Sequence, residues 1–247
     1  MKELTVDINC DVGEGIGNEK ELFPYISSCN VACGGHAGDA ETMTAIVRLA
    51  LRHGVKLGAH PSYPDTKNFG RVSIQLPKKK LIRSIRQQLA AFTSVLKAEF
   101  ATLHHIKPHG ALYNDIAGDG DLARTFLEAV DDFRGQTILY VPYGSVIEKE
   151  AADQGFQVAK EAFGDRNYND DLSLVSRALP NALIEMPSKV LQHITSIVRD
   201  QKVITITGIP VAVVADTLCI HGDTPTALEI LVYLSSELPR QHIHIKK

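Results

Sequence analysis

Hydrophobic and polar residues along the chain follow two spacings, one typical of strands and one typical of helices. Residues 4–8 alternate apolar with polar side chains, which predicts a first strand. The apolar residues within 43–51 recur at helical spacing. Asp39 can cap the start of that helix, and Gly54 can end it. The two spacings then follow each other down the chain, so strands and helices are expected to alternate.

The remaining elements are predicted from the same two patterns. Further strands are expected at residues 29–33, 55–59, 104–107, 137–141, 157–160 and 217–220. Residues 182–185 form either another strand or only a loop, and weaker strand patterns occupy residues 203–206 and 211–214. Helices are expected at residues 81–96, 122–133, 145–154, 187–200 and 224–237.

Alternating strands and helices predict an α/β protein with a mainly parallel sheet. About seven repeats in one chain favour a closed or nearly closed, distorted (β/α) barrel over an open doubly wound sheet. No linker or low-complexity segment interrupts residues 1–247, so we expect a single barrel domain.

Composition excludes two classes of partner. The 26 basic and 29 acidic residues give a formal net charge of -3, and the one basic run, residues 78–80, falls at a predicted helix start. A nucleic-acid-binding protein would need a clustered basic face, so no nucleic acid is expected. No stretch approaches the roughly 18 apolar residues of a membrane span. With four scattered cysteines and no secretory signal pattern, the expected location is the cytoplasm.

Charged and imidazole side chains collect where the predicted strands end. The βα loops of a barrel converge on one face, so these residues are expected to share one cleft. Buried charges must be paired, so packing alone does not readily explain why charged residues follow so many of the strands. The candidates are Asn9, Asp11, His36, His60, Lys107, His109, Glu161, Arg166, His221 and Asp223.

Three chemistries fit such a cleft, and the spacing does not choose between them. Carboxylates and histidines can transfer protons. Asp11, His36 and His60 could bind a divalent metal ion. Lys107 and Arg166 could hold a phosphate or carboxylate. Glycines 13, 15 and 17 do not fit the pattern of a phosphate-binding loop. Cys10, Cys33 and Cys219 are interpreted as buried thiols, with a role as nucleophile as the less favoured hypothesis.

At these residues the sequence resembles the LamB/YcsF family. The resemblance spans residues 7 to 225 in order and rests on several separate blocks. They are residues 7–14 (DINCDVGE), 30–39 (NVACGGHAGD), 58–65 (GAHPSYPD), 69–71 (FGR), 107–114 (KPHGALYN) and 219–225 (CIHGDTP), with Glu161, Asp165, Arg166 and Tyr168. Gly35 stands where the family usually has Phe, which predicts a larger or looser pocket near His36.

The resemblance implies a barrel related to the glycoside hydrolase/deacetylase group and an ATP-dependent 5-oxoprolinase activity, which opens 5-oxo-L-proline to L-glutamate. It also implies two partner subunits, B and C. ATP is expected to be bound with those partners, since the chain has no recognisable nucleotide motif.

Roles follow as hypotheses. Asp11, His60, Lys107 and His109 are assigned to catalysis, with His109 expected to have a pKa near neutrality. Substrate binding is assigned to Asn9, His36, Asn114, Glu161, Arg166, His221 and Asp223. Two alternatives stay open: a metal-dependent amidase or deacetylase-like hydrolase that needs no ATP, and a non-catalytic subunit that binds substrate for its partners.

Overall fold

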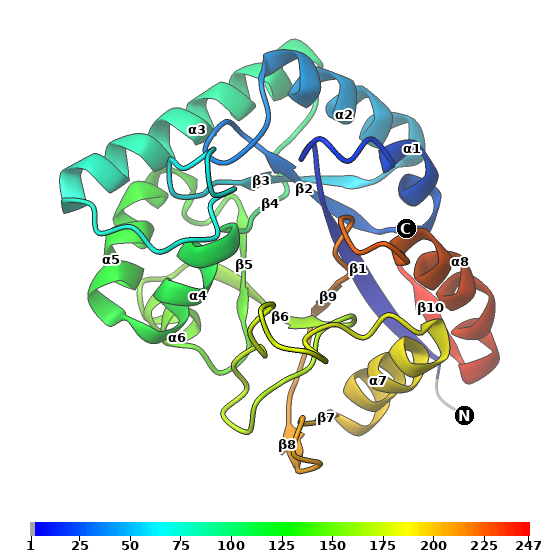
Figure 1. The fold of residues 1–247 in the computed structure, drawn as a ribbon. Coiled ribbons are helices and arrows are strands. Elements are labelled where there is room, and N and C mark those ends of the chain that lie inside the picture. Colours follow the sequence, from blue (N-terminus) through cyan, green and yellow to red (C-terminus); the bar gives the residue numbers. More distant parts are fainter. Residues whose placement is uncertain (1–2) are drawn as a thin grey trace.

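In the computed structural model, which describes residues 3–247, seven parallel strands close a barrel (Figure 1). The last strand of the barrel pairs with both the sixth and the first, so the sheet has no open edge at that point. The (β/α) barrel predicted from the sequence is therefore confirmed. Its strands are β1 (Leu4–Val12), β2 (Ser28–Ala32), β3 (Lys56–His60), β4 (His105–Ile106), β5 (Ile138–Pro142), β6 (Gln157–Phe163) and β9 (Thr217–Cys219).

Helices surround the barrel on its outside (Figure 1). They are α2 (Ala40–His53), α3 (Lys78–Ala98), α5 (Gly120–Ala129), α6 (Val146–Asp153), α7 (Pro187–Asp200) and α8 (Ala227–Glu237). The ends of α2 are those predicted from its sequence. The Asp39 carboxylate accepts a hydrogen bond from the Thr42 amide at 2.8 Å, and Gly54 adopts the left-handed conformation that closes the helix.

Two weaker strand patterns lie outside the barrel. β7 (Lys202–Ile204) and β8 (Pro210–Ala212) pair with each other as an antiparallel hairpin, whereas β6 pairs directly with β9. The pattern at residues 182–185 is a loop with one isolated bridge to Arg166.

Three regular elements have no counterpart in the sequence-based prediction. They are α1 (Glu19–Leu22), α4 (Gly110–Gly118) and β10 (Ile243–Ile245), which pairs in parallel with the start of β1. Short 3-10 turns occupy Phe23–Tyr25, Asp131–Phe133 and Pro239–Gln241.

Alternate residues of β1 point into the barrel, because successive side chains of a strand face opposite ways. Ile8 is fully buried among apolar residues, whereas Asp7 and Asn9 enter a polar interior. Asp7 accepts hydrogen bonds from Ser28 and Thr217, and Asn9 donates to Glu161. The polar part of the barrel interior is therefore a connected hydrogen-bond network.

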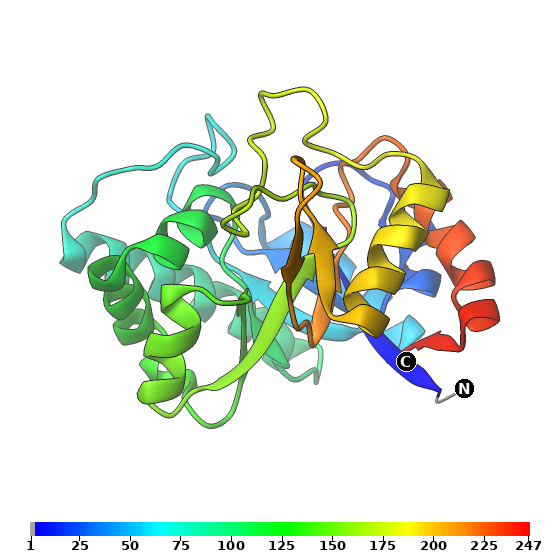
Figure 2. The same ribbon diagram turned by 90° about the horizontal axis from the view of Figure 1, so that it is seen from below.

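Long connections rise at one end of the barrel (Figure 2). They include the segment between β3 and α3 and the segment between β6 and α7, which both follow the carboxyl ends of strands. Across residues 3–247, the helices are too short or too polar for any of them to cross a membrane.

Candidate functional site

A cavity of about 550 Å³ opens at the carboxyl ends of the barrel strands. Most of the residues singled out from the sequence line it, as expected from their positions after strands. These are Asp11, His60, Lys107, His109, Asn114, Glu161, Arg166, His221 and Asp223. Asn9 and His36 are buried and do not line the cavity.

Lys107 is the centre of the cavity floor. Its ammonium group lies 2.9 Å from Glu161 Oε1 and 3.2 Å from Asp11 Oδ1. It also contacts Asn9 Oδ1 at 3.2 Å and Cys219 Sγ at 3.1 Å. Burial alone would lower the pKa of Lys107, but the neighbouring negative groups, Asp11 first among them, raise it well above the usual value. Lys107 is therefore a fixed positive charge.

Asp11 bridges Lys107 and His60. Its Oδ1 accepts from the Asn30 amide at 2.7 Å, and its Oδ2 lies 3.3 Å from His60 Nε2. Burial opposes its charge, yet His60 and Lys107 hold the pKa of Asp11 well below its usual value. Burial likewise disfavours a charged His60, but the Asp11 carboxylate raises the pKa of His60 overall. Asp11 is thus an anion that faces the cavity.

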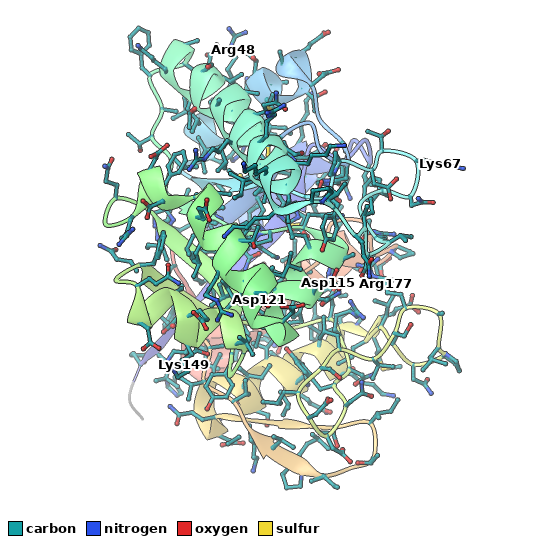
Figure 3. The ribbon with its side chains drawn as sticks, turned by 90° about the vertical axis from the view of Figure 1, so that its left-hand side faces the viewer. Arg48, Lys67, Asp115, Asp121, Lys149 and Arg177 are labelled. Carbon is teal, nitrogen blue, oxygen red and sulfur yellow. The ribbon has the colours of Figure 1, made fainter. Side chains whose placement is uncertain are left out.

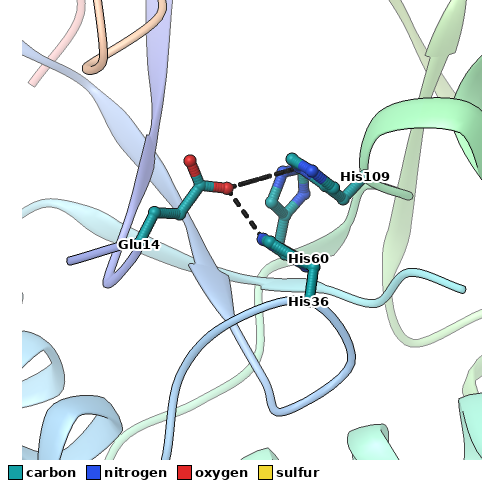
Figure 4. Close-up of side chains that lie close together, drawn as sticks. All are labelled: Glu14, His36, His60 and His109. Atoms are coloured by element: carbon teal, nitrogen blue, oxygen red, sulfur yellow. Dashed lines mark hydrogen bonds and ion pairs between the residues drawn. The ribbon is translucent and has the colours of Figure 1, made fainter. Parts of the chain in front are cut away.

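Glu14 completes a second group of ionisable side chains with three histidines (Figure 4). Its Oε1 lies 2.8 Å from His36 Nε2, 3.3 Å from His109 Nδ1 and 3.8 Å from His60 Nε2. Burial raises the pKa of Glu14 to about 7, and the charge of nearby Asp11 adds to that effect. Burial lowers the pKa of His36 to about 3, so its ring is neutral.

His109 has the defined direction that its neighbours predict. Gly110 has φ +58, and a Cβ there would lie 2.5 Å from the Gly70 carbonyl oxygen, so the turn that aims His109 needs glycine. The expected near-neutral pKa is wrong. Burial, with the adjacent His60 and His36, holds the pKa of His109 well below the usual value.

His221 forms a separate pair with Asp165 on the other side of the cavity. Its Nδ1 lies 2.9 Å from Asp165 Oδ1, and its ring stacks on Phe163 at 5.3 Å between centroids. Asp165 is fully buried and also accepts from the Thr224 hydroxyl. Burial would raise the pKa of Asp165, but His221 lowers it overall. The pair fixes the loop after β9 to the loop after β6.

Arg166 holds the loop over the mouth. Its guanidinium donates to the carbonyl oxygens of Val175 and Ala182, at 2.6 and 3.3 Å. Two other arginines, Arg71 and Arg177, reach Asp223 Oδ2 at 2.5 and 3.0 Å. Their side chains are 42% and 31% exposed, so these guanidinium groups can meet an anion that enters the cavity.

Several cavity residues were not singled out from the sequence, among them Glu14, Arg71, Tyr113 and Arg177. Glu14 and Tyr113 lie inside the quoted blocks 7–14 and 107–114, close to residues that were chosen. Tyr113 donates to Glu161 at 2.6 Å and closes the network under the cavity. Arg177 lies in a loop without regular pattern, so only the structure brings it to the site.

The pocket near His36 is not loosened by Gly35. A Cβ at that position would lie 2.3 Å from both the Gln88 Oε1 and the Ser62 Oγ, so the space that a larger side chain would need is already filled. The expectation of a larger pocket is wrong. The cysteines are buried thiols as interpreted, and burial raises the pKa of Cys33 to about 12 and that of Cys219 well above its usual value.

The fold and the site together define a closed (β/α)-barrel protein with a charged cavity where barrel enzymes carry their active sites. Residues 6–247 match the model of the LamB/YcsF family, and the chain belongs to that family.

Similar proteins cover nearly the whole chain. The A subunit of the 5-oxoprolinase of Pyrococcus furiosus is 40% identical, and that of Pyrococcus horikoshii is 41% identical, each over 98% of this chain and 97% of the relative. The crystal structure of the lactam utilization protein from Thermus thermophilus aligns with a TM-score of 0.91 at 38% identity, over 98% of this chain and 99% of that one.

Proposed function

We propose that this chain is the A subunit of an ATP-dependent 5-oxoprolinase, which opens the lactam 5-oxo-L-proline to L-glutamate. The observation that carries the proposal is the Asp11 carboxylate, which faces the cavity between the Lys107 ammonium and the His60 imidazole. The names of the similar proteins, which are 5-oxoprolinase A subunits and a lactam utilization protein, support lactam as the substrate class.

A lactam is an unactivated amide, so its carbonyl needs activation before water can attack. In the proposed reaction the amide oxygen takes the terminal phosphoryl group of ATP and ADP leaves. Water adds to the ring carbon, the C–N bond breaks with a proton passing to nitrogen, and γ-glutamyl phosphate is hydrolysed by a second water. Asp11 accepts the proton of the attacking water, and Lys107 stabilises the negative charge that develops on oxygen.

The substrate carboxylate is assigned to the arginines at the mouth. Arg166 is engaged with backbone carbonyl groups, whereas Arg71 and Arg177 meet at the partly exposed Asp223. A planar guanidinium binds a carboxylate through two parallel hydrogen bonds. Arg177 lies on the segment between β6 and α7, so substrate binding would engage that segment as well.

Arg177→Gln is expected to raise the KM for 5-oxoproline by about 10- to 100-fold and to change kcat little, because a hydrogen bond to a charged group contributes about 1.5–3 kcal/mol. Steady-state kinetics of the assembled enzyme measure both constants. Arg48→Gln is the matched control, since it breaks the surface pair with Glu99 far from the mouth (Figure 3). A KM within twofold of the parent would remove Arg177 from substrate recognition.

ATP coupling is assigned to the partner subunits B and C. The isolated chain is expected to show little 5-oxoproline-dependent ATP hydrolysis, and the mixture of all three subunits is expected to restore it. Phosphate release and glutamate formation, followed in the same sample, should rise together. Coupled turnover by the purified chain alone would contradict this division of work.

A second candidate function is a metal-dependent amidase that needs no ATP, and the Glu14–histidine group favours it. It predicts glutamate formation by the chain alone when a divalent metal ion is added and ATP is left out. The same assay of the isolated chain therefore separates the two candidates.

A further inference from the structure

Three loops and the end of one strand bring one carboxylate and three imidazoles to a single point (Figure 4). Glu14 follows β1, His36 follows β2, His60 ends β3 and His109 follows β4. One potential ligand atom from each side chain lies within 4.8 Å of all the others. The group is therefore built from consecutive repeats of the barrel and is held by the strands beneath it.

Hydrogen bonds to backbone carbonyl groups fix two of the rings. His60 Nδ1 lies 2.7 Å from the Lys107 carbonyl oxygen, and His109 Nε2 lies 3.0 Å from the Phe69 carbonyl oxygen. A carbonyl oxygen only accepts, so the proton of each ring sits on that outer nitrogen. The inner nitrogens, His60 Nε2 and His109 Nδ1, are only 3.0 Å apart and turn toward Glu14. This is the arrangement that orients histidines as metal ligands.

His36 is placed by contacts other than a backbone hydrogen bond. Its ring stacks on that of His109 with 3.6 Å between centroids and 4° between planes, and its Nε2 reaches Glu14 at 2.8 Å. Its Nδ1 is buried without a hydrogen-bond partner among residues 3–247. An unsatisfied buried polar atom costs about 1–3 kcal/mol, so a contribution to folding stability does not by itself explain why a histidine occupies this position.

The geometry points to a binding site for one divalent transition-metal ion, Zn²⁺ fitting best, held by Glu14, His36, His60 and His109. A tetrahedral Zn²⁺ with bonds of about 2.0–2.1 Å separates its ligand atoms by roughly 3.3 Å. Four of the six separations between these ligand atoms are 2.8, 3.0, 3.3 and 3.8 Å and scatter around that value. Imidazole nitrogen suits zinc, cobalt or nickel, whereas magnesium and calcium prefer oxygen ligands.

The position gives the ion access to the cavity. Glu14, His60 and His109 line it, whereas His36 is buried and does not. Asp11 Oδ2 lies 3.3 Å from His60 Nε2, close enough to orient a water molecule beside the ion. A metal ion here would face the same space as Lys107 and could polarise a carbonyl oxygen. The site stands independently of the reaction proposed above.

A second group, Asp11, Cys219 and His221, also brings potential ligand atoms together. It is the weaker site, because the Lys107 ammonium lies 3.1 Å from Cys219 Sγ and 3.2 Å from Asp11 Oδ1. That fixed positive charge opposes a metal cation. His221 Nδ1 is moreover engaged with the Asp165 carboxylate.

The test is metal binding by the full chain after chelator treatment and addition of Zn²⁺ or Co²⁺. One equivalent is expected to survive desalting, measured by elemental analysis. The Co²⁺ form should show the visible absorption of a tetrahedral nitrogen–oxygen site and no sulfur-to-metal charge-transfer band. Glu14→Gln and His36→Gln should each weaken binding by roughly a hundredfold or more. His221→Gln, the matched control in the other group, should keep the full metal content.

Three outcomes would overturn the site. They are wild-type protein that retains no metal, a sulfur-to-cobalt band, or loss of metal from His221→Gln instead of Glu14→Gln. The absorption spectrum uses wild-type protein, so it decides the question even where a variant fails to fold. Metal content is measured without substrate or ATP, so failure of the 5-oxoprolinase proposal would leave this result unchanged.

Discussion

Asp11→Asn is expected to lower turnover of the assembled enzyme by about 10²- to 10⁴-fold, the range for loss of general acid–base help. Asparagine cannot accept a proton, and it removes the negative charge between Lys107 and His60. Its side-chain oxygen can still accept from the Asn30 amide, so the fold should be kept. Turnover with saturating 5-oxoproline and ATP is the measurement, with thermal unfolding of the same preparation.

Asp115→Asn is the matched control for that experiment. Asp115, labelled in Figure 3, accepts from the Tyr63 and Ser73 hydroxyl groups, and it is not one of the residues that line the cavity. Its replacement should leave turnover unchanged. A fully folded Asp11→Asn enzyme that works within about threefold of the parent would instead favour a non-catalytic subunit that only presents substrate to its partners.

Local signals were enough for most of the barrel. The Asp39 cap and Gly54 define α2 through bonds between near neighbours, so both ends could be read from the sequence. The weaker pattern at residues 203–206 does contain a strand, yet that strand pairs in a hairpin outside the barrel. Closure is decided by the pairing of β6 with β9, a contact between distant segments that no local pattern encodes.

The candidate site also contains residues that local sequence predicts and residues that only the fold brings together. Residues directly after strands, such as Lys107 and His109, could be placed at the mouth because strand ends converge there. Glu14 lies beyond its strand, in a turn between Gly13 and Gly15 that both have positive φ, and the turn carries it to the three histidines. The pKa of His109 could not be foreseen either, because it depends on burial and on two neighbouring rings from distant parts of the sequence.

Lys107→Met is expected to lower the free energy of unfolding by about 3–5 kcal/mol, because removing one partner of a buried ion pair leaves the other charge uncompensated. The Lys107 and Glu161 side chains are 3% and 0% exposed, and Asp11 is 10% exposed. Methionine has similar length but gives the two carboxylates no partner. For a chain of this size the loss corresponds to a fall in Tm of roughly 6–20 °C.

Two further variants make the Lys107 result specific. Lys149→Met breaks the exposed pair with Asp153 on α6 and should change stability by less than about 0.5 kcal/mol (Figure 3). Adding Glu161→Gln to Lys107→Met removes one of the two uncompensated negative charges and should restore part of the lost stability. A double-mutant cycle measures this effect as a coupling energy. Urea unfolding of the parent, the single variants and the double variant supplies the values. Two results would contradict this: a loss of less than about 1 kcal/mol in the free energy of unfolding of Lys107→Met, or a double variant no more stable than the Lys107→Met single variant. Either would mean that the lysine does not neutralise the carboxylates beneath the cavity, and its assignment as a fixed positive charge for the reaction would then be wrong.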